Sequence, residues 1–413
     1  MLTRVSSFLW IVSLVFIFLR PFISEYAFLS LGFWYNLGLI FVPGLYLISI
    51  HKEAKPRSFL HYGVILFFLA VLLSMVIKGF TLWSLYELYL FIPNLLIFYT
   101  ASSLKPNKLK QLIVVLLFAA SIIGIYAVYQ YFIGLGHTAE YLKQNSPNQL
   151  AEEFLSRRRT FATFISPNIF ASYVAMMFFV GMGFLIGKRQ TPRVRLLSGV
   201  SILLMAAALL LTKSIGGVLS FSTAVFIFVF CAFFYLTPQH GLKKFGLRKL
   251  TFAVVIILFV FSIAAGFLSQ KRIQQSFSKD NSGNNSVIQR GYYWQASVDM
   301  IKKSPLFGVG WRKFGLSYGS YKPAQANMSH YSHNVFLQIA AETGLLGLFS
   351  FAWVTILFFI SALRSIRIDD ELQGLKIGLF CAACVFLIHN FVDLSFYFGQ
   401  VSFFWWMILG IFA

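Results

Sequence analysis

About twelve apolar stretches, each long enough to cross a lipid bilayer, dominate this chain of 413 residues. Hydrophobic residues make up 58% of the sequence and charged residues 11%, and a soluble domain of this size could not bury so much apolar surface. The sequence therefore predicts an all-α polytopic membrane protein, with eleven to thirteen transmembrane helices allowed by the uncertain boundaries. The predicted helices cover residues 5–23, 27–50, 60–77, 81–101, 112–133, 161–187, 195–212, 214–236, 250–269, 335–363, 375–392 and 396–413.

The basic residues orient the predicted bundle. Short connections on one side carry most of them, whereas those on the other side contain or border only Arg20, Lys78 and Lys213. Because cytoplasmic loops are enriched in Lys and Arg, both termini are expected in the cytoplasm. The net charge of +21 is explained by this topology, so no nucleic-acid partner is expected.

Two connections on the outward side are too long to be turns, at residues 134–160 and 270–334. They divide the chain into helices one to nine (1–269, including the loop 134–160), an extracytoplasmic loop (270–334), and helices ten to twelve (335–413). In the second loop Trp294, Val298 and Ile301 recur at helical spacing, which predicts an amphipathic helix at the membrane surface.

The acidic residues do not indicate a metal site. The chain has only 13 of them, and the one adjacent pair, Asp369 and Asp370, falls on the predicted cytoplasmic side. A divalent cation bound by carboxylates of the outward face is therefore not expected, and no other cofactor is indicated.

Arginines, by contrast, gather on the outward side. Arg157, Arg158 and Arg159 end the first long loop, and Arg290 lies in the second. A guanidinium group is planar, permanently charged and able to bind two phosphate oxygens at once. A lipid pyrophosphate would suit these arginines, while contact with ordinary phospholipid headgroups is the alternative.

Histidines stand at the end of the second loop, in the run His330-Tyr331-Ser332-His333-Asn334. An imidazole here could accept the proton of an attacking sugar hydroxyl, an effect worth about 10² to 10⁴ in rate. Interfacial anchoring and helix capping are the alternatives. Two histidines at this spacing can also bind zinc, but no third ligand is apparent nearby.

Four runs together resemble the O-antigen ligase and polymerase family. They are RRRTFATFISPN at 157–168, QRGYYW at 289–294, SPLFGVGW at 304–311, and HYSHN followed by AETGLLGLF at 341–349. Their order and spacing match the family, and the layout of helices around one large loop extends the similarity over the rest of the chain. Each run alone is weak, but four in order on one face favour the family strongly.

The resemblance implies roles for individual residues. Arg159 and Arg290 resemble the arginines that bind the pyrophosphate of an undecaprenyl-linked glycan, and His333 resembles the catalytic histidine. Lys213, in the run TKSIGG at 212–217, would face the same phosphates, although Ile215 follows Ser214 where the family often has Arg. The expected supporting residues are Arg158, His330, Asn334 and Trp294.

These roles predict an inverting glycosyltransferase that needs neither metal nor cofactor. Its partners would be an undecaprenyl-pyrophosphate-linked glycan as donor, a hydroxyl acceptor and the lipid bilayer. An acceptor on lipid A core would make it an O-antigen ligase, the favoured interpretation; a glycan repeat would make it a polymerase, and a protein serine an oligosaccharyltransferase. A transporter of lipid-linked sugars is the alternative from another class, for which the intramembrane candidates are Glu87, His389 and Asp393.

Overall fold

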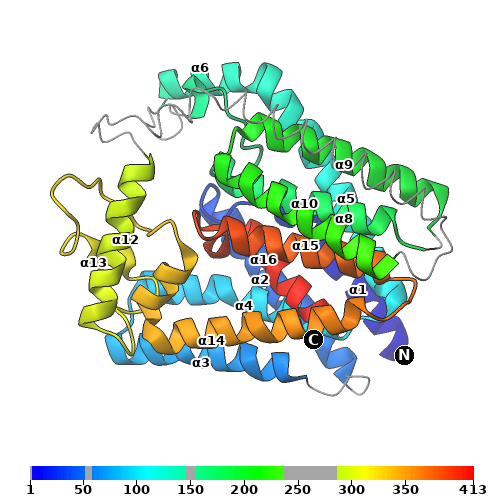
Figure 1. Cartoon of the computed structure of the whole chain (residues 1–413), viewed down its shortest axis with the longest axis horizontal. Helices are drawn as coiled ribbons and strands as arrows, with labels where there is room; N and C mark the ends of the chain where they lie inside the picture. The colour runs from blue at the N-terminus through cyan, green and yellow to red at the C-terminus, as the bar shows by residue number, and fades with distance from the viewer. Residues whose placement is uncertain (1, 52–57, 146–153, 189, 237–285) are drawn as a thin grey trace.

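The computed structural model describes all residues except 1, 52–57, 146–153, 189 and 237–285, and the described part contains helices and no strands (Figure 1). The prediction of an all-α polytopic membrane protein is confirmed. Nine described helices are long and apolar enough to cross a membrane, and two shorter apolar helices, α15 and α16, join them. The predicted stretch 250–269 lies outside the described residues. The bundle consists of α1 (Leu2–Leu19), α2 (Leu29–Ser49), α3 (Phe59–Lys78), α4 (Leu82–Ser102), α5 (Pro106–Tyr129), α8 (Pro167–Leu185), α9 (Pro192–Thr212), α10 (Ile215–Leu236), α14 (Val335–Ile366), α15 (Gln373–His389) and α16 (Gly399–Ile411).

Local sequence determines where several of these helices begin. Proline occupies the first position of α5, α8 and α9, where its missing N–H has no partner to lose. Ser166 caps α8 by accepting from Asn168 N at 3.2 Å, and Asn334 caps α14 by accepting from Leu337 N at 3.0 Å. Residues 161–166, predicted to be part of a helix, therefore precede α8.

The centre of the bundle is formed by α8, α15 and α16, which lie in the middle of Figure 1. Trp405 and Trp406 of α16 are completely buried. Between α8 and α15, a side-chain carbon on Gly183 would approach the carbonyl oxygen of Gly374 to 2.6 Å, so glycine allows the two backbones to touch. Large apolar side chains such as Phe8 and Trp34 are exposed on the outer helices, as expected for a surface in contact with lipid.

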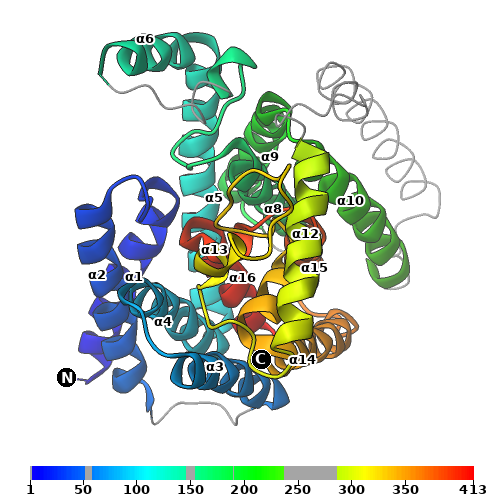
Figure 2. The ribbon, with the colours of Figure 1, turned by 90° about the vertical axis from the view of Figure 1, so that its left-hand side faces the viewer.

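The second long loop folds onto one end of the bundle, here called the loop end. Figure 2 shows α12 (Ser286–Lys303) and α13 (Phe314–Tyr318) lying across the ends of the bundle helices. The predicted amphipathic helix is α12. Its buried face carries Tyr293, Ala296 and Met300, which form a small core with α13, and Val298 is exposed. Both termini lie on the side away from α12 in Figure 1.

A kink in α14 joins this loop to the bundle. Gly344 has a φ of 70°, and a side-chain carbon there would overlap the carbonyl group of Leu306. Backbone hydrogen bonds run from Leu345 N to Pro305 O (2.7 Å), from Val309 N to Ala341 O (2.8 Å) and from Gly310 N to Glu342 O (2.9 Å). The runs SPLFGVGW and AETGLLGLF thus bind each other through their backbones, and this joint attaches the loop to α14.

Candidate active site

Arg159 is buried beneath the start of α8. Its Nε donates to the carbonyl of Thr212 at 2.9 Å, and its Nη2 donates to Oδ1 of Asn168 at 2.7 Å. The same Asn168 oxygen accepts from Oγ of Ser214 at 3.0 Å. The runs at 157–168 and 212–217, separated in sequence, therefore meet at Asn168.

Gln130 holds the turn that carries Arg159. It lies in the π-helical turn η3 (Gln130–Gly134), and its Oε1 accepts from Thr160 Oγ1 (2.6 Å), Phe161 N (2.9 Å) and Ala162 N (2.8 Å). Ala162 has a φ of 49°, a left-handed conformation that side chains other than glycine rarely adopt. One buried amide thus fixes a strained turn, as π-helical insertions at functional sites often do.

Lys213 and Arg158 share the ring of Tyr131. Lys213 caps the C-terminus of α9 and has a φ of 50°. Its Nζ donates to the carbonyl of Arg157 at 3.0 Å and lies 5.7 Å from the centre of the Tyr131 ring. The Arg158 guanidinium lies 5.3 Å from the same centre and is exposed. Two cations near one ring make this corner of the loop end attractive to anions.

His333 stands in a left-handed turn, with a φ of 54°, directly before α14. Its half-buried ring stacks on Tyr293 of α12, and its Nδ1 is shielded from solvent and has no hydrogen-bond partner within the described part of the chain. Burial lowers the pKa of His333 to about 4; the nearby Asp393 raises the pKa, and Arg290 lowers it further. The imidazole is therefore neutral at pH 7, and Arg290 and Asp393 both belong to its electrostatic surroundings.

The supporting residues separate into different roles. The side chain of Asn334 is the cap of α14. His330 is exposed and lies against α13, where a side-chain carbon on Gly315 would come within 2.6 Å of its Nδ1. Trp294 packs against the small core of the loop. The structure therefore places Asn334 next to His333 in the chain but commits its amide oxygen to the helix.

The sequence indicates His389 and Asp393 only as transporter candidates, whereas in the structure Asp393 is an electrostatic neighbour of His333. His389 is buried at the end of α15, and its Nδ1 lies 3.4 Å from Ser395 Oγ. The neighbouring Asn390 accepts from Val335 N at 2.9 Å, which joins the end of α15 to the start of α14.

A second buried network lies deeper in the bundle. Arg312, in the loop, donates to Oε1 of Glu87 at 2.7 Å and to Tyr331 OH at 3.2 Å. Glu342 of α14 accepts from Gln338 at 2.9 Å and from Tyr397 OH at 3.3 Å. Because Tyr331 stands two residues before His333, this network supports the histidine turn, and the ion pair with Arg312 accounts for the acid within α4.

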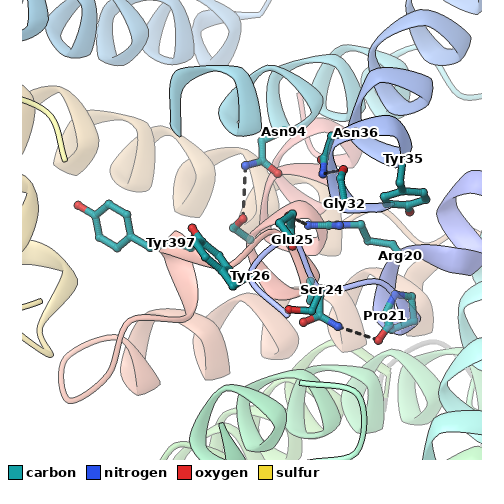
Figure 3. A network of polar contacts seen from close by, with 12 residues as sticks. Arg20, Pro21, Ser24, Glu25, Tyr26, Gly32, Tyr35, Asn36, Asn94 and Tyr397 are labelled. Atoms are coloured by element: carbon teal, nitrogen blue, oxygen red, sulfur yellow. Dashed lines mark hydrogen bonds and ion pairs between the residues drawn. The ribbon is translucent and has the colours of Figure 1, made fainter. Parts of the chain in front are cut away.

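Figure 3 shows a companion ion pair in which Arg20 points at Glu25, with Tyr26 beside it. Tyr26, the residue after Glu25, donates from its OH to Glu87 at 3.0 Å. The segment 25–26 therefore links this ion pair to the one between Arg312 and Glu87. Glu25, Glu87, Asn94 and Trp311 line a cavity of about 20 Å³, room for about one water molecule. Sequence reasoning missed the pairing, because Arg312 and Glu87 are 225 residues apart.

Fold and site together define a polytopic membrane protein with arginine, lysine and histidine gathered at one end of its helices. Residues 200–352 match the sequence model of a family described as O-antigen ligase. The chain is also 26% identical over 129 residues to the exopolysaccharide production protein ExoQ of Rhizobium meliloti (strain 1021), a match that covers 29% of this chain and 28% of that protein. The resemblance to the O-antigen ligase family is confirmed.

Proposed function

We propose that this protein transfers a glycan from undecaprenyl pyrophosphate to an acceptor hydroxyl at the outer face of the bacterial inner membrane, without a metal. The observation that supports the proposal best is the grouping of a neutral histidine, His333, with Arg290 and Asp393 at the loop end. Arg159 and Lys213 lie in segments joined through Asn168 and Ser214, at the start of α8 and α10.

In the proposed reaction, the acceptor hydroxyl attacks the anomeric carbon of the donor sugar while His333 takes its proton. The bond between that carbon and the pyrophosphate oxygen breaks, and the electron pair leaves with undecaprenyl pyrophosphate. Attack from the opposite face inverts the anomeric configuration. Arg159, Arg290 and Lys213 would stabilise the charge on the leaving group, which explains why no metal is required.

The acceptor divides the proposal into two candidates. Transfer to lipid A core, the activity of an O-antigen ligase, is the first, and the family match over 200–352 supports it. Joining of lipid-linked repeats into a polysaccharide is the second, and the similarity to a protein of exopolysaccharide production supports that one.

The test is a transfer assay with the protein in nanodiscs, an undecaprenyl-pyrophosphate-linked oligosaccharide and EDTA. A shift of lipid A core on a gel would identify a ligase, and a ladder with the spacing of the repeat would identify a polymerase. Donor movement between leaflets without transfer to either acceptor would refute the proposal in favour of a transporter.

A further inference from the structure

The N-terminus of α10 faces a buried nitrogen of His389. His389 is 1% exposed, and its Nε2 has no hydrogen-bond partner among the described residues. A side-chain carbon built on Gly216, in the first turn of α10, would lie 3.7 Å from this Nε2 and 3.8 Å from the adjacent Cδ2. The ring edge that bears Nε2 is therefore turned toward the start of α10.

The start of α10 is itself rich in hydrogen-bond donors. An α-helix leaves the N–H groups of its first turn without acceptors inside the helix, and the helix dipole adds partial positive charge there. Ser214 Oγ accepts from one of them, Gly217 N, at 3.2 Å, and Ile215 and Gly216 supply the others of that turn. Because α10 is 22 residues long, its helix dipole is fully developed.

Ser395 is compatible with a His389 tautomer that carries its proton on Nε2. Its Oγ is the group beside Nδ1, at 3.4 Å, and when this hydroxyl donates to Nδ1 the imidazole proton must sit on Nε2. Nε2 is then a buried donor that needs an acceptor, because an unmade hydrogen bond in the interior is costly.

We infer that His389 Nε2 and the first turn of α10 bind a phosphate group, and that this phosphate belongs to the polyprenyl pyrophosphate of the donor. The inference rests on the proposed function. It adds a phosphate ligand from α15 to the arginines, and it gives the two histidines different tasks: His333 takes a proton and His389 donates a hydrogen bond. Gly216 has no side chain, so no side-chain atom of its own stands between the ring of His389 and the start of α10, where a side-chain carbon would also lie 3.1 Å from Val392 Cγ2.

The test is equilibrium binding to the full-length protein in nanodiscs, without acceptor. The probes are undecaprenyl pyrophosphate, inorganic pyrophosphate and phosphatidylglycerol. His389→Ala should raise the Kd for undecaprenyl pyrophosphate about tenfold or more, since it removes a hydrogen bond to a charged group. His389→Gln, whose amide still donates, should restore most of the affinity. The exposed His51→Ala is the matched control and should not change it.

Gly216→Ala leaves His389 unchanged and adds a methyl group between its ring and the start of α10, 3.1 Å from Val392 Cγ2, so it should weaken binding even if His389→Ala folds poorly. Thermal midpoints of the ligand-free variants separate lost affinity from lost folding. Unchanged Kd values for Gly216→Ala and for folded His389→Ala, or an equal loss for phosphatidylglycerol, would refute the inference. A wild-type protein that does not bind undecaprenyl pyrophosphate would refute the proposed function as well.

Discussion

Arg159 and Asn168 are joined by a hydrogen bond of 2.7 Å between Nη2 and Oδ1, although one ends a loop and the other opens α8. The same oxygen accepts from Ser214 at the start of α10. The orientation of the arginine is therefore fixed by two helices at once.

Asn168→Ala should lower kcat/KM for the donor about ten- to a hundredfold, because it leaves a buried guanidinium with one hydrogen bond fewer. Steady-state transfer kinetics would measure the loss. Ser214→Ala preserves the bond between Arg159 and Asn168 and should cost less. If the serine variant lost as much activity as the asparagine variant, Asn168 would not orient Arg159.

His333→Ala should reduce transfer by about 10² to 10⁴ while the protein still folds, since it removes the proposed general base. The assay is glycan transfer in nanodiscs, with the yield of folded protein followed by size-exclusion chromatography. His137, exposed on α6 (Leu135–Asn145), provides the matched control, and His137→Ala should retain full activity. Full activity in His333→Ala would rule out the assignment.

The pH dependence of transfer should follow the low pKa of His333. Because the pKa is lowered to about 4, the neutral base persists in mild acid, and kcat/KM should fall only as the pH approaches 4. Asp393 raises this pKa, so Asp393→Asn should move the acid limb to lower pH. Arg290 lowers it, so Arg290→Gln should move the limb to higher pH. A wild-type limb near 6.5 would contradict the assignment.

The pair formed by Glu87 and Arg312 should behave as a coupled unit in unfolding. Replacing either residue by Met leaves a buried charge without its partner, a change that costs about 3 to 5 kcal/mol. The double variant should be less destabilised than the sum of the single variants. Thermal unfolding of all three in detergent would test the coupling, and additive losses would disprove it.

Gly344→Ala should prevent the loop from docking, because the residue has a φ of 70° and a methyl group would overlap the Leu306 carbonyl. We expect a strong loss of folded protein and of activity. Gly199 in α9 has open space around its Cβ position, so Gly199→Ala should be neutral or stabilise the helix by about 0.5 to 1 kcal/mol. Fluorescence size-exclusion of both variants would make the comparison.

Most bundle helices could be predicted from the sequence, because a bilayer requires long apolar stretches and leaves few alternatives to a helix. The start of α8 differs from the prediction, which placed it at residue 161 and not at Pro167. Residues 161–166 are mostly apolar and read as part of a span, yet Gln130 holds the turn to which Phe161 and Ala162 belong, and Ser166 with Pro167 starts the helix later. Hydropathy does not detect a turn that is built from apolar residues.

The site was predictable in its residue types but not in its connections. Arg159, Lys213 and His333 were predicted from their resemblance to residues of the family, and their roles stay predictions. Asn168 and Ser214, which are 46 residues apart, resemble ordinary polar residues near helix starts until the fold brings them together. The predictions for 250–269 and 270–285 stay predictions.

The kink at Gly344 also fixes the position of the loop along the axis of α14. Because the loop is hydrogen-bonded to the backbone of a helix that crosses the bilayer, the histidine turn is held at a fixed depth relative to the lipid rather than floating above it. In the proposed function, the pyrophosphate of a lipid-linked donor would lie at the level of the headgroups. The backbone conformation of Gly344 would then keep His333 at the depth at which this donor is bound.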